Sequence, residues 1–178
     1  MFDVHDFGAK GDGRTPDTAA LQAAIDACAQ SGGGTVYVGP GRYRSNTLVL
    51  RSDMTLYLDS GARIEAEPGA RFDGALLRGK DLKNVRIAGS GTFYGNDISF
   101  WWPRQGAEAF PEEGPWAHPI RYAAGHRPSM LLLEDCSYVD VQGVSFEASP
   151  GWTGAIIRCR HMNFLDVQVK NRGDGPNT

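Results

Sequence analysis

An internal repeat is the feature of this sequence that most restricts its fold. Four apolar positions recur after 23 residues, so that Val139, Val141, Val144 and Phe146 map onto Met162, Phe164, Val167 and Val169. The same shift maps Cys136 onto Cys159 and Leu133 onto Ile156, and a backward shift of 54 residues leads from Val139 and Val141 to Val85 and Ile87. A unit of this size is typical of one coil of a β-helix, in which equivalent residues stack on one another.

One helix is expected before the repeats, over residues 15–31. Thr15 is the expected N-cap and Pro16 the first helical residue, where a missing N–H costs nothing. Leu21, Ile25 and Cys28 fall on one face. The glycines at 32–34 end the helix.

Short strands are expected after this helix, over residues 35–38, 47–50, 54–58 and 63–65, with no second helix to make a βαβ unit. The remaining choices are an antiparallel sandwich and a parallel β-helix, and the fixed offset favours the second. Residues 96–125 have no period and are expected to form a loop inserted into one coil. The sequence therefore predicts one all-β domain over residues 1–178, a right-handed parallel β-helix with a helix capping its N-terminal end.

Composition excludes several classes of function. The formal net charge is -3 and no basic cluster is present, which argues against nucleic-acid binding. No apolar run reaches the about 18–20 residues of a membrane span. The three cysteines have no metal-binding spacing, so no metal or cofactor is expected; Cys136 and Cys159 are interpreted as stacked thiols, with a disulfide as the alternative. Residues 1–6 lack the features of a secretory signal, which fits either a cytoplasmic protein or a secreted one whose signal was removed.

Several motifs together resemble glycoside hydrolase family 28, the polygalacturonases, within the pectin-lyase-like superfamily. They are Asp6-Phe7-Gly8-Ala9-Lys10-Gly11-Asp12-Gly13, Gly32-Gly33-Gly34-Thr35-Val36, Arg127-Pro128, Ser149-Pro150-Gly151-Trp152 and Gly175-Pro176-Asn177-Thr178. The opening motif is shared by several β-helix families. The combination of Ser-Pro-x-Trp with Pro-Asn-Thr is more typical of the hydrolases.

The resemblance implies inverting hydrolysis of α-1,4-linked galacturonan in pectin, without a metal. It also implies that the catalytic carboxylates follow Thr178, so that this chain holds no catalytic residue, is expected to be a β-helix truncated at its C-terminal end, and is inactive by itself. The expected substrate-binding residues are Asn177, Thr178, Trp152 and Arg127; the alternatives are that Trp152 only covers a coil corner and that Arg127 anchors a loop through an ion pair or hydrogen bond. The expected partners are pectin-type polysaccharides or oligogalacturonides and the missing C-terminal part of the β-helix.

Two alternatives remain open from the sequence. One is a non-hydrolytic carbohydrate-binding β-helix of the tailspike type. The other is a pectin or rhamnogalacturonan lyase, or a rhamnogalacturonan hydrolase, of the same fold. His161 is interpreted as a solvated side chain.

Overall fold

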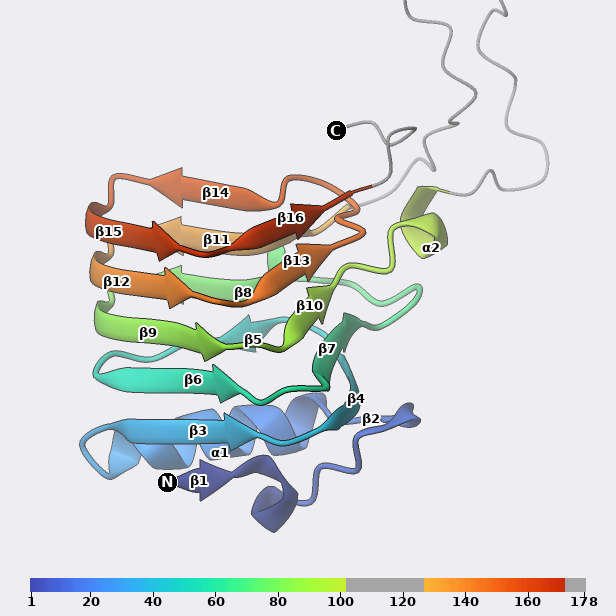
Figure 1. Ribbon diagram of the computed structural model, residues 1–178, viewed down its shortest axis with the longest axis horizontal. Coiled ribbons are helices and arrows are strands. Elements are labelled where there is room, and N and C mark those ends of the chain that lie inside the picture. The colour runs from blue at the N-terminus through green and yellow to red at the C-terminus, as the bar shows by residue number, and fades with distance from the viewer. Residues whose placement is uncertain (102–126, 172–178) are drawn as a thin grey trace, which may run out of the picture.

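The computed structural model describes residues 1–101 and 127–171, which form three parallel sheets stacked as in a parallel β-helix (Figure 1). Sheet A contains β1 (Phe2–Asp3), β3 (Gly34–Val38), β6 (Met54–Leu58), β9 (Lys83–Gly89), β12 (Ser137–Gln142) and β15 (Arg160–Leu165). Sheet B contains β2 (Asp12–Pro16), β4 (Gly41–Ser45), β7 (Ala62–Ala66), β10 (Thr92–Tyr94), β13 (Ser145–Glu147) and β16 (Gln168–Lys170). Sheet C contains β5 (Leu48–Val49), β8 (Ala75–Lys80), β11 (Ser129–Glu134) and β14 (Gly154–Ile157).

The 23-residue repeat is confirmed by the strand register. Val139 pairs with Met162 and Val141 with Phe164 between β12 and β15, and Leu133 pairs with Ile156 between β11 and β14. The 54-residue offset is confirmed as well, because Val85 pairs with Val139 between β9 and β12. The backbone N–H of Cys136 contacts Cys159 Sγ at 3.4 Å, and both cysteines are free thiols.

Apolar ladders fill the inside of the coil. In sheet A the ladder runs through Val36, Leu56, Ile87, Val141 and Phe164, and its first four members are buried. In sheet B, Phe93 and Phe146 stack with ring centroids 5.2 Å apart. Stacking of like residues explains why the repeat is visible in the sequence only at inward positions.

The last described coil, β14 to β16, leaves one side of its ladders uncovered. Phe164 is 47% exposed, whereas Val141 directly below it is fully buried. The other exposed apolar side chains of this coil are Ile156, Ile157, Leu165 and Val169. Ile157 and Leu165 pair with the outward residues Glu134 and Gln142, so we call only Ile156, Phe164 and Val169, which continue inward ladders, the apolar end face.

Non-glycine residues with positive φ recur at equivalent places of successive coils. Asp81, Asp135 and Arg158 have φ between 52° and 54° and lie between the strands of sheet C and sheet A. Asn84, Tyr138 and His161 have φ between 54° and 58° near the start of β9, β12 and β15. The left-handed conformation turns the chain at the corner, and aspartate and asparagine tolerate it better than bulkier residues do.

Helix α1 (Thr18–Gln30) lies at the N-terminal end of the stack, where the sequence places a cap (Figure 1). Its first helical residue is Thr18, two residues later than the predicted Pro16, because Pro16 ends strand β2 and pairs with Arg44. Asp17, not Thr15, is the N-cap residue, and its carboxylate accepts from the backbone N–H groups of Lys10 and Gly11. The assignment of Thr15 and Pro16 to the helix was therefore wrong, since both residues belong to an edge strand.

The chain between β10 and β11 interrupts the coil where the inserted loop is expected. A short helix, α2 (Ile98–Trp101), begins this segment, and most of the expected loop lies in residues 102–126, outside the described residues. No helix in residues 1–101 or 127–171 is long and apolar enough to cross a membrane.

Candidate functional site

Arg127 and Trp152 lie together at the corner where sheet B passes into sheet C. Arg127 stands two residues before β11, and Trp152 stands two residues before β14 in the next coil. The backbone N–H of Met130 donates to the Trp152 carbonyl oxygen at 2.9 Å, which holds the two segments in parallel register. The structure thus brings together two of the four expected substrate-binding residues. Asn177 and Thr178 lie outside the described residues.

A cavity of about 290 Å³ opens between these segments, lined by Arg127, Ser129, Gly151 and Trp152. The Trp152 side chain is 65% exposed, so its indole adds little to the core and presents a face to solvent. Arg127 is half-buried. The lining thus combines an aromatic ring, a guanidinium group and a hydroxyl group.

Gly151 allows the Trp152 loop to approach the neighbouring coil. A Cβ atom at this position would lie 3.0 Å from the Pro128 carbonyl oxygen, closer than nearly all real contacts of this kind. A larger residue would therefore push the loop and the indole away from Arg127.

Hydrogen bonds among three polar side chains fix the loop that carries Trp152. Ser149 Oγ and Thr153 Oγ1 are 2.9 Å apart, and Asn171 Nδ2 donates to Thr153 Oγ1 at 3.1 Å. The Ser149 backbone N–H donates to Asn171 Oδ1 at 2.9 Å, which closes the network. Because Ser149 is buried, these bonds hold the loop that carries Trp152 in one position.

Sequence reasoning missed these positioning residues. The 23-residue offset maps Ala148 onto Asn171, so the repeat contained the signal that Asn171 lies against the Ser149 loop. The apolar pattern alone does not reveal it, because Asn171 is polar.

The described lining residues offer groups that suit an acidic sugar, and they include no acid–base pair. A guanidinium group can bind a carboxylate through two hydrogen bonds, and an exposed indole can pack against the apolar face of a sugar ring. None of the four described residues that line it is a carboxylic acid or histidine. Among residues 1–101 and 127–171, no group of three or more His, Cys, Asp or Glu residues is placed to hold a metal ion.

Comparison with known proteins identifies the family of this chain. Residues 1–105 match the model of a family described as rhamnogalacturonase A/epimerase, pectate lyase-like. The chain is 51% identical to mannuronan C5-epimerase AlgE1 of Azotobacter vinelandii over 99 residues, which cover 56% of this chain and 7% of the epimerase. It is 34% identical to an exo-poly-alpha-D-galacturonosidase of Dickeya chrysanthemi, over 54% of this chain and 19% of that enzyme.

A solved structure extends the likeness to nearly the whole chain. The hyperthermoactive exopolygalacturonase from Thermotoga maritima superposes with a TM-score of 0.78 at 26% identity, covering 97% of this chain and 47% of that one. The chain thus spans less than a fifth of each curated relative named above and about half of this structural neighbour. The chain is a parallel β-helix domain, and it belongs to the rhamnogalacturonase A/epimerase, pectate lyase-like family.

Proposed function

We propose that this chain binds an acidic polysaccharide at the cavity of Arg127 and Trp152, as the substrate-binding part of an enzyme that hydrolyses α-1,4-galacturonan. One observation carries the proposal: a guanidinium group and an exposed indole, from adjacent coils, line a single cavity. Substrate contact by Asn177 and Thr178 is part of the same proposal.

Physical chemistry favours a uronic acid as the ligand. Each sugar of such a polymer carries one carboxylate, which a planar guanidinium can bind in a bidentate manner. The ring carbons of the same sugar present C–H groups that can pack on Trp152. The names of the relatives support this class, since galacturonan and mannuronan are both polymers of uronic acids.

Hydrolysis with inversion needs two carboxyl groups about 6.5–9.5 Å apart. We propose that coils stacked on the apolar end face supply them in a longer protein, since strands of adjacent coils lie about 4.8 Å apart and neighbouring coils can give the required separation. Phe164 and Val169, both about half exposed, would be buried by such a coil. This chain by itself is then a binding unit without hydrolytic activity.

A second candidate is the binding part of an alginate-active epimerase or lyase. Identity to the mannuronan epimerase, 51% over 99 residues, exceeds the 34% identity to the galacturonosidase. Both candidates use the cavity to bind a polyuronate, and they differ in which uronic acid fits it. A non-hydrolytic carbohydrate-binding β-helix is the third candidate.

The experiment is a calorimetric titration of the 178-residue chain with tetragalacturonate and, in parallel, with tetramannuronate. Trp152→Ala and Arg127→Lys should each weaken binding by about tenfold, because one loses the ring contact and the other the bidentate geometry. Arg160→Ala, which removes an exposed arginine from β15 in sheet A, is the matched control and should leave affinity unchanged. Equal affinity of the Trp152 and Arg127 variants and the wild-type chain would refute the site.

Product analysis separates the candidate reactions in a longer protein that contains this chain. New reducing ends without ultraviolet absorbance indicate a hydrolase, and unsaturated ends that absorb indicate a lyase. Conversion of mannuronate without chain cleavage indicates an epimerase. A protein that binds and gives none of these products is a carbohydrate-binding β-helix.

A further inference from the structure

The outer face of sheet A carries a second cavity, on a different sheet from β11 and β14. Its volume is about 420 Å³, within the range of about 300–1,000 Å³ that is usual for small-molecule sites. It is lined by Asp53, Met54, Thr55, Asn84, Val85, Arg86, Tyr138 and Asp140, which come from β6, β9, β12 and the residue before β6. We call it the sheet A trough.

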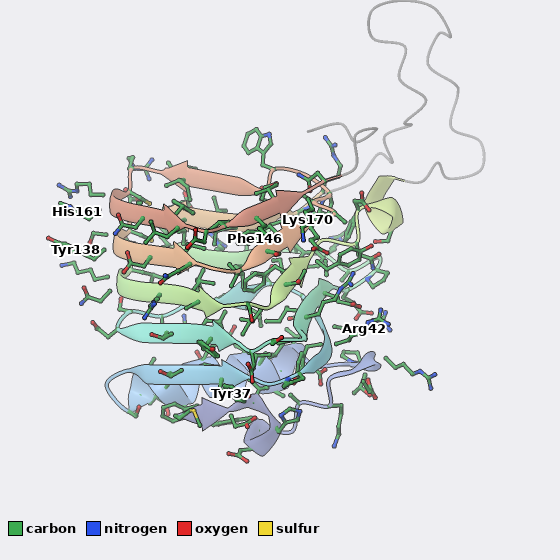
Figure 2. All side chains as sticks on the ribbon, viewed as in Figure 1. Tyr37, Arg42, Tyr138, Phe146, His161 and Lys170 are labelled. Carbon is green, nitrogen blue, oxygen red and sulfur yellow. The ribbon has the colours of Figure 1, made fainter. Side chains whose placement is uncertain are left out.

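Tyr138 forms an aromatic wall of this trough. Its side chain is 57% exposed, and its ring stacks on that of His161 with centroids 4.6 Å apart and planes 9° apart. Figure 2 shows both rings projecting from the same edge of the stack, with His161 one coil further along. Since Asn84 occupies the equivalent place in the coil on the other side of Tyr138, the second face of the phenol ring lies toward the trough.

Tyr138 occupies a corner position where a smaller residue would be less strained. Tyr138 has a φ of 58°, an unfavourable value for a bulky side chain. The equivalent residue one coil below is Asn84, which tolerates this conformation well. Because the ring is exposed, it contributes little to the core and remains accessible to a ligand.

The polar groups of the trough are held in place by partners on neighbouring strands. Asn84 Nδ2 donates to Asp53 Oδ1 at 2.7 Å. Arg86 Nη2 donates to Gln142 Oε1 at 2.6 Å. Asp140 Oδ1 accepts from Asn163 Nδ2 at 2.7 Å. Because a carboxylate can accept several hydrogen bonds, both acids keep capacity for ligand hydroxyl groups.

The charge of the trough selects the class of ligand. Two carboxylates, Asp53 and Asp140, and one guanidinium, Arg86, give its lining a net charge of about −1. A polyuronate would be repelled, whereas the hydroxyl groups of an uncharged sugar suit carboxylate and amide partners. The Arg127 cavity differs, because its described lining residues include a cation and no acid.

We propose that the sheet A trough binds a neutral pyranose chain, with one sugar ring packed on Tyr138 and its hydroxyl groups bound by Asp53, Asn84 and Asp140. The site is separate from the Arg127 cavity and does not depend on the function proposed there. It gives the chain a second carbohydrate-binding surface with a different preference.

The test is a chemical-shift titration of the 178-residue chain with four neutral tetrasaccharides of galacto, gluco, manno and xylo configuration. At least one should shift the amide signals of Asn84, Tyr138 and Asp140. Tyr138→Asn should weaken that binding about five- to tenfold, the size of a lost aromatic contact. Asparagine suits positive φ, so this variant should unfold at the same denaturant concentration as the wild-type chain or a higher one.

Trp152→Ala separates the two sites. It should leave the affinity of the trough for the neutral tetrasaccharide unchanged, and Tyr138→Asn should leave tetragalacturonate binding unchanged. The proposal is overturned if no neutral tetrasaccharide shifts these signals, if the folded Tyr138→Asn variant binds as tightly as the wild-type chain, or if tetragalacturonate shifts the trough signals more strongly than the neutral sugars.

Discussion

Gln22 of α1 takes the place of a missing strand at the edge of sheet C. Strand β5 is the last strand of that sheet, and the side chain of Gln22 bonds to its backbone on the open side. Nε2 donates to the Val49 carbonyl oxygen at 3.0 Å, and the Val49 N–H donates to Oε1 at 2.8 Å. The primary amide thus reproduces both hydrogen bonds that a neighbouring strand would make.

Gln22→Ala removes both bonds, together with the bond from Nε2 to Asp26 Oδ1 at 3.1 Å, and leaves the two backbone groups of Val49 without these partners. Each neutral hydrogen bond contributes about 1 kcal/mol net, so the expected loss is about 2 kcal/mol. Water can reach the half-buried Gln22 side chain, which lowers the expected loss to about 1–2 kcal/mol. With an m value of about 2 kcal/mol/M, the urea midpoint should fall by about 0.5–1 M.

Urea unfolding followed by circular dichroism, at low protein concentration, measures this shift. Gln30→Ala is the matched control, because it makes the same substitution in the same helix at an exposed position. It should leave the midpoint nearly unchanged. Equal midpoints for Gln22→Ala and Gln30→Ala would refute the idea that the amide replaces a strand.

Substitutions at Gly89, Asp12 and Phe164 test other features of the coil. Gly89→Ala should lower the Tm by about 6–12 °C, because the new Cβ atom overlaps the Leu58 carbonyl oxygen and the residue has a φ of 113°. Gly32→Ala places its Cβ atom with nothing within 4 Å and should lower the Tm far less, so equal losses would contradict this explanation. Hydrogen bonds from the backbone N–H groups of Thr15 and Arg14 lower the pKa of Asp12 from 3.8 to about 2. The contribution of Asp12 to stability is therefore present above about pH 4 and is lost as the pH falls to about 2. Asp12→Asn should remove this pH dependence, and an NMR titration midpoint near 4 for Asp12 would contradict it. The wild-type chain should self-associate through the apolar end face, and Phe164→Lys should reduce this in light scattering; a monodisperse wild-type monomer would argue against it.

The inside of the fold was predictable because stacking makes equivalent inward residues alike. Val85, Val139 and Met162 share one ladder, and their spacing in the sequence predicts the register that the strands adopt. Strand β4 was not predicted, because Tyr43 is its one buried aromatic residue and the neighbouring Arg42, Arg44 and glycine give no apolar pattern typical of a strand. An outward position is free to vary from coil to coil, so the repeat carries no signal there.

The candidate sites were harder to predict for the same reason. The separation between equivalent residues changes from coil to coil, as Asp53 and Asn84 are 31 residues apart and Arg86 and Asp140 are 54 apart. Contacts of this kind follow from the lengths of the insertions, which sequence periodicity does not fix. Arg127 and Trp152 were found through a motif, whereas the sheet A trough has no motif in the sequence.

Each of the two proposed sites contains one exposed aromatic ring. Trp152 and Tyr138 are the most exposed of the described Phe, Tyr and Trp side chains, and each lines one of the two cavities. Neither ring is needed by a core that the inward ladders already fill. Because a rigid coil holds both, a polysaccharide with acidic and neutral sugars at a matching separation would engage them together, and its second contact would form at a high effective concentration. Such a polymer should therefore bind more tightly than either tetrasaccharide, and loss of either ring should remove that advantage.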